Sequence, residues 1–209
     1  MLRNSTLNNV PKFVFVIHLK LKRQRNQKQE MKTVKEAMGL EIGNKVKDFI
    51  GTDQNGNKIQ LTELLKKGKV VIVFYRGQWC PICIPHVRKL QNGLEKIQEK
   101  GASIVLISPE NQENIQKTIL KTNVTIPVLY DKNYEIMKSF NVDFTPGKTL
   151  KFVYNTVLRA DLQNVQSDDS QTLPVPATYI IGMNGKVLWR HFNRDYKKRS
   201  KMKNILEQL

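Results

Sequence analysis

The apolar positions along the chain predict alternating strands and helices. Continuous β-branched and aromatic runs at residues 70–75 and 102–107 are typical of strands buried on both faces of a parallel sheet. Between these runs, apolar residues recur at helical spacing, namely Val87, Leu90, Leu94 and Ile97. They predict a helix from residue 81 to Gly101, and Pro85 is expected to bend its first turns.

The rest of the chain continues this alternation and adds two hairpins. Asn55-Gly56 and Asn184-Gly185 each lie between short apolar stretches, which is the pattern of a two-stranded hairpin. The other expected elements are a short helix opening at Thr62, a helix near residues 115–120, a strand at 127–130, a short helix at 134–140 and a closing helix at 202–209. Residues 143–172 lack clear periodicity and are expected to form an inserted helix and loop.

The order of these elements predicts an α/β fold. Strand, helix, strand, helix and strand are followed by a hairpin and a helix, and crossovers between parallel strands are right-handed. This order corresponds to a three-layer fold with a mixed central sheet, the thioredoxin-like arrangement. A chain of 209 residues is long enough for one such domain with a tail.

The N-terminal residues differ from the rest of the chain in composition. Residues 1–38 are expected to be a basic, disordered extension, and residues 39–209 the domain. Residues 1–29 hold seven Lys and Arg and no acid, so +7 of the net charge of +17 lies there and +10 elsewhere. The apolar run at residues 13–19 is too short for a secretory core or a membrane-spanning helix. We therefore expect a cytoplasmic protein with no membrane partner.

The basic charge suits an anionic partner and equally a solvated, lysine-rich surface. One basic cluster near the C-terminus is interpreted as a solvated approach to the last helix in preference to an anionic docking face. It comprises Arg190, His191, Arg194, Lys197, Lys198, Arg199, Lys201 and Lys203. No nucleic-acid-binding motif accompanies the charge, so nucleic acid is not expected as a partner.

The two cysteines of the chain, Cys80 and Cys83, lie where the first apolar run meets the predicted helix. At this spacing they can face each other on the first turn of a helix and close a disulfide. A zinc site needs two more ligands at short spacing, and only His18, His86 and His191 are available, so no metal is expected. Two inert buried thiols are the other alternative. C-x-x-C beside a strand-helix-strand pattern favours a redox site.

Six segments carry a family likeness: FYRGQWCPIC, ISPEN, VLYDKN, LPVPATYI, GMNGKV and RDYKKR. Together they resemble the peroxiredoxin-like family of the alkyl hydroperoxide reductase and thiol-specific antioxidant type, in the thioredoxin superfamily. The likeness spans residues 41–209.

The resemblance implies a thiol-dependent peroxidase that reduces hydrogen peroxide or small organic hydroperoxides. Cys80 would attack the peroxide as a thiolate, favoured by a helix N-terminus, and form a sulfenic acid. Cys83 would capture that acid as a Cys80–Cys83 disulfide, and a thioredoxin-like reductant would restore both thiols. No cofactor is implied, and a monomer or homodimer is expected.

Three further residues are expected to support the cysteines. Arg76 adds positive potential near Cys80, and Trp79 shields it. Pro176 is expected to be preceded by a cis peptide bond where the late strand faces the disulfide. His86 is interpreted as a surface or packing residue in preference to a base.

The chain also departs from the family pattern. Val73 and Gly77 stand where the family usually has proline and a threonine or serine, and Val175-Pro176 stands in place of the usual arginine. Arg76, Gln78 or Arg159 could replace that arginine. These departures favour an alternative function, a general thiol-disulfide oxidoreductase of the thioredoxin type. A redox sensor that uses residues 143–172 as an interface is a third possibility.

Overall fold

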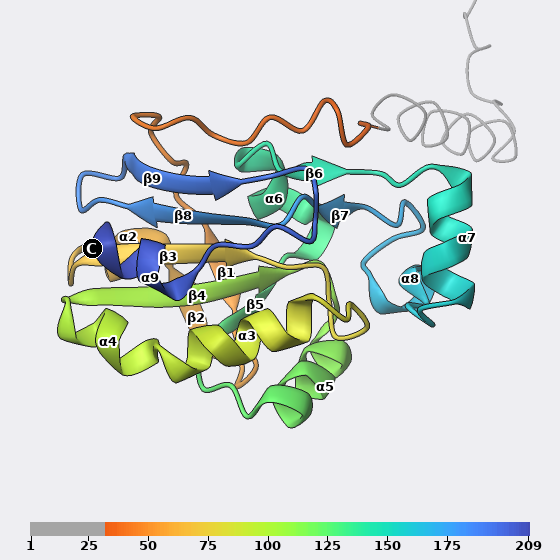
Figure 1. Cartoon of the computed structure of the whole chain (residues 1–209), viewed down its shortest axis with the longest axis horizontal. Coiled ribbons are helices and arrows are strands. Elements are labelled where there is room, and N and C mark those ends of the chain that lie inside the picture. Colours follow the sequence, from red (N-terminus) through yellow and green to blue (C-terminus); the bar gives the residue numbers. More distant parts are fainter. Residues whose placement is uncertain (1–31) are drawn as a thin grey trace, which may run out of the picture. The chain divides into compact units, whose positions relative to one another are not determined.

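The computed structural model describes residues 32–209, and its centre is a mixed β-sheet (Figure 1). The strands are β1 (Ile50–Thr52), β2 (Lys58–Gln60), β3 (Lys69–Phe74), β4 (Ala102–Ser108), β5 (Val128–Tyr130), β6 (Asp143–Phe144), β7 (Leu173–Pro174), β8 (Ala177–Ile181) and β9 (Val187–Phe192). The helices are α2 (Leu61–Leu65), α3 (Cys83–Asn92), α4 (Leu94–Glu99), α5 (Gln112–Thr122), the 3-10 turn η1 (Lys132–Tyr134), α6 (Glu135–Ser139), α7 (Lys148–Thr156), α8 (Leu162–Val165) and α9 (Met202–Glu207).

The main sheet has seven strands in the order β2-β1-β5-β4-β3-β8-β9. β3 lies parallel to β4 and antiparallel to β8, so it has a hydrogen-bonded neighbour on each side. Its side chains alternate between two apolar clusters: Val71 and Val73 belong to one, and Ile72 and Phe74 to the other. The apolar run of residues 70–75 is therefore continuous because both faces of β3 are covered.

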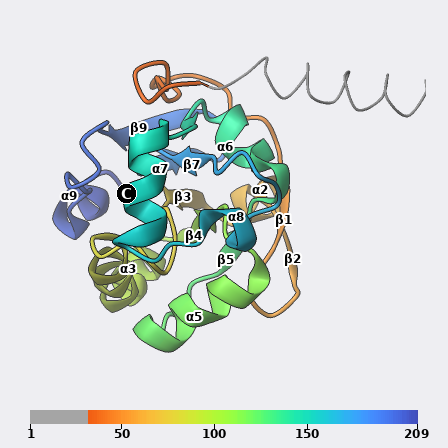
Figure 2. The same cartoon turned by 90° about the vertical axis from the view of Figure 1, so that its right-hand side faces the viewer.

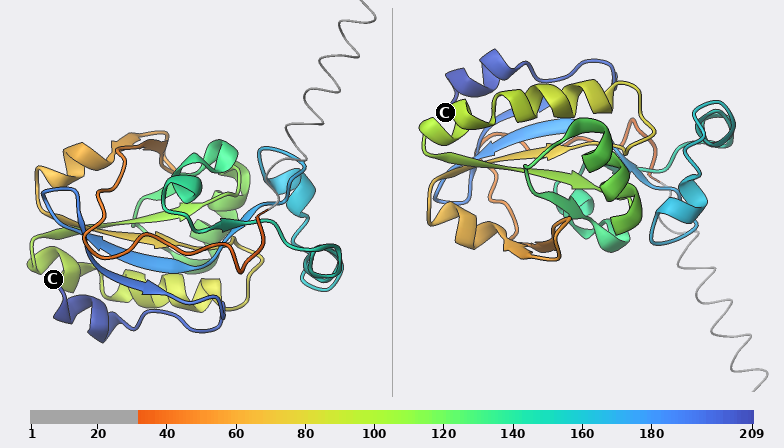
Figure 3. Two further views of the ribbon diagram at one scale, coloured as in Figure 1. Left: turned by 90° about the horizontal axis from the view of Figure 1, so that it is seen from above. Right: turned by 90° about the horizontal axis from the view of Figure 1, so that it is seen from below.

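Helices cover the sheet on both faces, as the two apolar clusters show. Leu90 of α3, Ile97 of α4, Ile115 of α5 and Ile205 of α9 contribute to the first cluster. α2 and α6 contribute to the second cluster, and Figure 3 shows α2 and α9 on opposite faces. The three-layer, thioredoxin-like fold with a mixed central sheet is confirmed.

The long helix expected after the cysteines is two helices. Pro85 lies in the first turn of α3, where a missing N–H is tolerated, and the break comes at Gly93 between α3 and α4. A Cβ at Gly93 would overlap the Met202 side chain. The close approach of α9 thus accounts for the glycine, and the expected bend at Pro85 is wrong as to its position.

The segment 143–172 leaves the sheet and returns to it. It contains β6, α7 and α8, and β6 pairs with β7 in a separate two-stranded sheet. Figure 2 shows α7 and α8 at the end of the sheet that carries the loop between β3 and α3. This segment therefore lies at the end of the fold where the cysteines are found.

Residues 32–38, which the composition assigns to the extension, contact the domain. The Thr145 N–H donates to the Lys32 carbonyl at 2.7 Å, and Arg194 Nε donates to the Ala37 carbonyl at 3.2 Å. Ala37 is fully buried. The expectation of a disordered extension is corrected for these seven residues, because backbone carbonyls in this segment accept hydrogen bonds from Arg194 of the domain. Residues 1–31 lie outside the described residues, and within 32–209 no helix has the length and apolar character to cross a membrane.

Replacing Phe140 by alanine should lower the free energy of unfolding by about 3–5 kcal/mol. The ring is fully buried and lies 5.0 Å from both Phe74 and Tyr179 between ring centroids. Chemical denaturation measures the change. Leu120→Ala is the control, since Leu120 is 80% exposed, and should change stability by at most about 0.5 kcal/mol. Equal losses in the two variants would contradict the assigned core.

Candidate active site

The two cysteines lie at the carboxyl end of β3, in the turn that leads into α3. The Cys83 N–H donates to the Cys80 carbonyl at 3.0 Å, and the Cys80 N–H donates to the Gly77 carbonyl at 3.2 Å. α3 begins at Cys83, and the Cys80 carbonyl accepts the Ile84 N–H at 3.4 Å, so both cysteines lie in the turn at the N-terminus of this helix. Both thiols are free and buried.

The structure favours a thiolate on Cys83 and disfavours one on Cys80. Arg199 Nη2 donates to Cys83 Sγ at 3.2 Å. Burial opposes ionisation of Cys83, but the hydrogen bond from Cys80 and the Arg199 charge outweigh it, and its pKa falls to about 6. The same hydrogen bond, together with burial, raises the pKa of Cys80 well above its usual range. Of the two thiols, Cys83 is therefore the one whose ionisation its surroundings favour.

Arg76 is a second cation near this anion. Its side chain is only 3% exposed, and its guanidinium lies over the rings of Phe144, Tyr154 and Tyr196, at 4.5 Å from the Tyr196 centroid. Nη1 donates to the Tyr154 hydroxyl at 3.0 Å. A backbone hydrogen bond from Arg76 and its charge both favour the Cys83 thiolate. The added positive potential thus acts on Cys83.

Trp79 and the inserted segment close one side of the site. Trp79 is 8% exposed, and its ring centroid lies 5.3 Å from that of Tyr154 in α7. Tyr154 therefore contacts both Arg76 and Trp79, which flank the loop before Cys80. Tyr154 thus connects α7 with the cysteine loop.

The absence of a side chain at position 77 is explained by a buried carboxyl group that lies against this glycine. Glu110 follows β4 and is fully buried, and its Oε2 accepts the Gln78 N–H at 2.8 Å. A Cβ at Gly77 would overlap the Glu110 carboxyl group. Burial raises the pKa of Glu110 to about 8, although the Gln78 hydrogen bond opposes the rise. A threonine or serine at position 77 is therefore excluded by Glu110, a neutral acid at neutral pH.

His86 is a packing residue, as expected, and it holds the segment that carries Arg199. Its Nε2 lies 3.1 Å from the Ser200 carbonyl, and Ser200 Oγ lies 2.8 Å from Thr178 Oγ1 in β8. Burial, and then the Arg199 charge, lower the pKa of His86 to about 4. The neutral ring links α3 to the connection between β9 and α9.

The expected cis peptide bond before Pro176 is wrong. No peptide bond between described residues is cis, and Pro176 is buried at the start of β8. The preceding chain is held extended, because the Val175 N–H donates to the Val142 carbonyl at 2.7 Å and β7 pairs with β6. This pairing carries the chain into β8 with trans geometry.

The three residues expected to replace the family's missing arginine, Arg76, Gln78 and Arg159, differ in where their side chains lie. Arg159 is exposed after α7, in a left-handed conformation, and the Gln78 side chain accepts a hydrogen bond from Lys121. Arg76 and Arg199 are the cations beside the cysteines. Within residues 32–209, no group of three or more His, Cys, Asp or Glu is arranged to hold a metal ion.

The comparison with protein families agrees with this arrangement. The model of the AhpC/TSA family matches residues 42–190. The chain belongs to the AhpC/TSA family. The resemblance found in the sequence is therefore confirmed, and this AhpC/TSA protein is a thiol oxidoreductase.

Individual relatives and solved structures are similar to this chain to different degrees. The thiol-disulfide oxidoreductase ResA of Bacillus thuringiensis subsp. konkukian is 26% identical over 150 residues, 71% of this chain and 68% of that protein. Peroxidoxin BcpB of Mycobacterium tuberculosis is a structural neighbour with a TM-score of 0.61 and 22% identity, over 81% of this chain and 96% of that one. A secreted disulfide oxidoreductase of the same organism has a TM-score of 0.52 and 16% identity, over 77% and 92%. The two structures bear on the fold alone.

Sequence reasoning missed three residues of the site of this AhpC/TSA protein. Arg199 was part of a basic cluster but was not singled out, and Tyr154 lies in the inserted segment without a motif. Glu110 could have been found, because it is an acid that follows a buried parallel strand within the ISPEN segment.

Replacing Arg199 by alanine should raise the lower of the two thiol pKa values from about 6 toward the usual value for cysteine, roughly 8.5. The reason is that the anion on Cys83 loses its hydrogen-bond donor and a nearby positive charge. Thiolate absorbance in the ultraviolet, followed against pH in the reduced protein, measures the shift. Arg199→Lys should give an intermediate value. An unchanged titration in Arg199→Ala would contradict the assignment.

Replacing Glu110 by glutamine should change how stability depends on pH. The pKa of Glu110 is raised from 4.5 to about 8, so its contribution to stability is complete below pH 4.5 and is lost as the pH rises through about 8. The glutamine variant lacks this loss. Its free energy of unfolding, relative to that of the unmodified protein, should therefore rise by a few kcal/mol between these pH values. Glu113→Gln, at a side chain that is 77% exposed, is the control. Parallel curves for Glu110→Gln and the unmodified protein would exclude a buried, neutral Glu110.

Proposed function

We propose that this protein is a thiol-disulfide oxidoreductase whose Cys80 and Cys83 reduce disulfides of other proteins. The observation that carries the proposal is the contact of Arg199 with the inner cysteine of the pair, where Nη2 donates to Cys83 Sγ at 3.2 Å and favours the thiolate there. A resolving thiol with a lowered pKa ionises readily, and its thiolate attacks a neighbouring disulfide quickly near neutral pH. The named activity of the ResA relative supports the same reading.

The reaction has two exchange steps. A proton moves from Cys80 to Cys83 within the hydrogen-bonded pair, and the Cys80 thiolate attacks the partner's disulfide. A Cys80–partner disulfide forms, and the first partner sulfur leaves as a thiolate that takes the proton from Cys83. The Cys83 thiolate then attacks the Cys80 sulfur, so that the Cys80–Cys83 disulfide forms and the second partner sulfur leaves as a thiolate. Two electrons pass from the cysteine pair to the partner.

The positions of the two cysteines suit these roles. Both thiols are buried, but Cys80 lies in the turn next to exposed Pro81, whereas Cys83 lies in the first turn of α3. Burial raises the pKa of Glu110 to about 8, which limits the negative charge that this carboxyl group places near Cys83 at neutral pH. As the resemblance implies, we propose a thioredoxin-like reductant that returns the disulfide to two thiols.

A peroxidase is the second candidate, supported by the family match. The Cys80 thiolate would attack the terminal peroxide oxygen, breaking the O–O bond to release water or an alcohol and leaving a sulfenic acid. The Cys83 thiol would then form the disulfide with loss of water. Gly77 supplies no side-chain hydroxyl three residues before Cys80, and Glu110 prevents one. Disulfide exchange needs no such group.

Replacing Cys83 by serine should trap a mixed disulfide between Cys80 and a protein substrate such as insulin. The second exchange step is blocked, so the adduct accumulates and is seen by mass spectrometry. Cys80→Ser is the matched control and should form no adduct. The unmodified dithiol protein should reduce insulin disulfides faster than it consumes hydrogen peroxide in the presence of thioredoxin and its reductase. Peroxide turnover without insulin reduction would favour the second candidate.

A further inference from the structure

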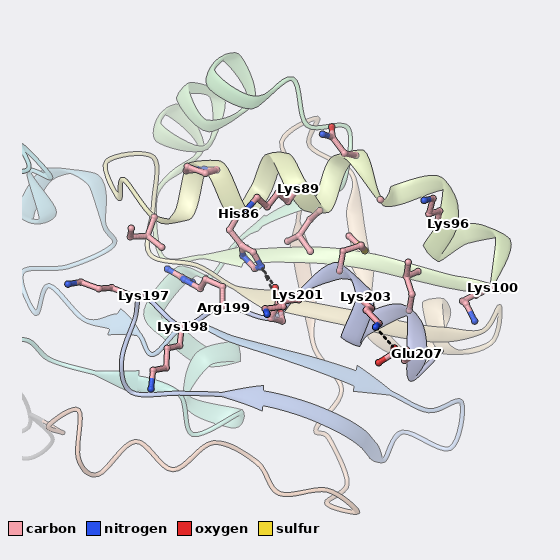
Figure 4. A pocket seen from close by; sticks show the side chains of 18 of the residues that line it. His86, Lys89, Lys96, Lys100, Lys197, Lys198, Arg199, Lys201, Lys203 and Glu207 are labelled. Atoms are coloured by element: carbon pink, nitrogen blue, oxygen red, sulfur yellow. Dashed lines mark hydrogen bonds and ion pairs between the residues drawn. The ribbon is translucent and has the colours of Figure 1, made fainter.

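A long groove begins beside the cysteines and runs between two helical walls. One wall is α3 and α4, and the other is the segment 197–207, which includes α9 (Figure 4). Pro81 and Ile82, the residues between the cysteines, line one end, and Lys100 at the end of α4 lines the other. We name this feature the basic groove. Arg199 lines it and also donates to Cys83, so the groove connects directly with the redox pair.

The basic groove has an apolar floor and a positive rim. Ile82, Leu90, Met202 and Leu206 contribute apolar surface to the lining. Eight lining residues are lysine or arginine, and Glu207 is the one acid among them. That acid lies 3.8 Å from Lys203, and among the described residues no other ion pair involves the lysines and arginine of the rim.

The basic cluster near the C-terminus therefore divides into two parts. Arg190 pairs with Glu41 at 2.7 Å, and Arg194 donates to backbone carbonyls of residues 34–37, so these two arginines hold the start of the domain. The remaining members from Lys197 to Lys203 line the groove. Three lysines of the α3–α4 wall, among them Lys96, line the same groove as these residues. A merely solvated surface gives no reason for lysines of two different walls to converge in this way. Cations that converge from two walls raise the potential inside the groove.

The dimensions match an extended polypeptide. α3 has 10 residues and α4 has 6, which at about 1.5 Å per residue gives a wall of roughly 24 Å. A strand-like peptide covers about 3.3 Å per residue, so roughly seven residues fit. The volume of the groove, about 1310 Å³, exceeds the upper end of the usual range for small-molecule sites, roughly 1,000 Å³.

We propose that the basic groove binds an acidic, extended segment that adjoins the disulfide of the partner protein. The inference rests on the proposed disulfide exchange and adds the chemistry by which the partner is recognised. Carboxylates of the segment meet the lysines of the rim, and its apolar side chains lie on the floor. The partner's disulfide is thereby placed at the Pro81 end, beside Cys80.

Two synthetic peptides test the proposal with the full-length protein. Both carry the same disulfide and a flank of leucine alternating with a polar residue, which is glutamate in one peptide and glutamine in the other. The acidic peptide should bind more tightly and be reduced with a higher kcat/KM, and added salt should reduce this preference. Equal binding and equal kcat/KM for the two peptides would overturn the proposal.

Charge-removing variants locate the binding. Lys96→Gln, Lys100→Gln and Lys203→Gln, combined in one protein, should weaken binding of the acidic peptide by roughly tenfold, since each exposed pair contributes a modest free energy. The matched control removes the same charge from exposed lysines outside the groove: Lys58→Gln, Lys67→Gln and Lys132→Gln. Equal weakening in both triple variants would mean that net charge alone attracts the peptide, and would refute the groove as its site.

The two proposals fail in distinguishable ways. Binding is measured by fluorescence anisotropy of a labelled acidic peptide without cysteine, which needs no turnover. If that peptide binds in the groove but no disulfide peptide is reduced faster than by Cys80→Ser, the proposed function fails and the binding site stands. If laurate binds in a lysine-dependent manner and the acidic peptide does not, the groove is a site for a small anionic amphiphile and the inference is wrong.

Discussion

The burial of β3 on both faces is the constraint on which the site depends. β4 and β8 pair with the two edges of β3, and helices cover both of its faces. The loop that carries the functional residues therefore lies beyond the carboxyl end of the strand. The chain leaves there through the loop that carries Arg76, Cys80 and Cys83. The parallel neighbour β4 ends at the same edge and delivers Glu110. The cysteines and the buried acid are thus brought together by strand register.

Charge balance in this buried place decides which thiol ionises. A buried anion needs a nearby cation, and Arg199 and Arg76 both favour the thiolate of Cys83. The other two titratable groups nearby are neutral at neutral pH, since burial raises the pKa of Glu110 and lowers that of His86. The Cys83 thiolate therefore has two guanidinium groups near it, and both favour its ionisation.

The two sides of the cysteine loop differ in character. On one side, Tyr154 of α7 contacts Trp79 and Arg76 and closes the site. On the other, the basic groove is open to solvent and has many more cations than acids. We therefore expect a partner protein to bring its disulfide to the cysteines from the side of the groove, where electrostatic attraction and contact area are both available.

The sequence by itself determined the order of elements and the place of the redox pair. The apolar run from Val70 to Phe74 and the C-x-x-C that follows it are local patterns. The strand and the redox pair can therefore be predicted without knowledge of distant residues. It also indicated that Gly77 breaks the family pattern. Only the tertiary structure decided why, because the excluded volume comes from Glu110, on another strand. The same holds for Arg199, which is 116 residues from Cys83 along the chain. Contacts between distant segments depend on how helices and loops pack over the sheet, and local periodicity does not encode that packing.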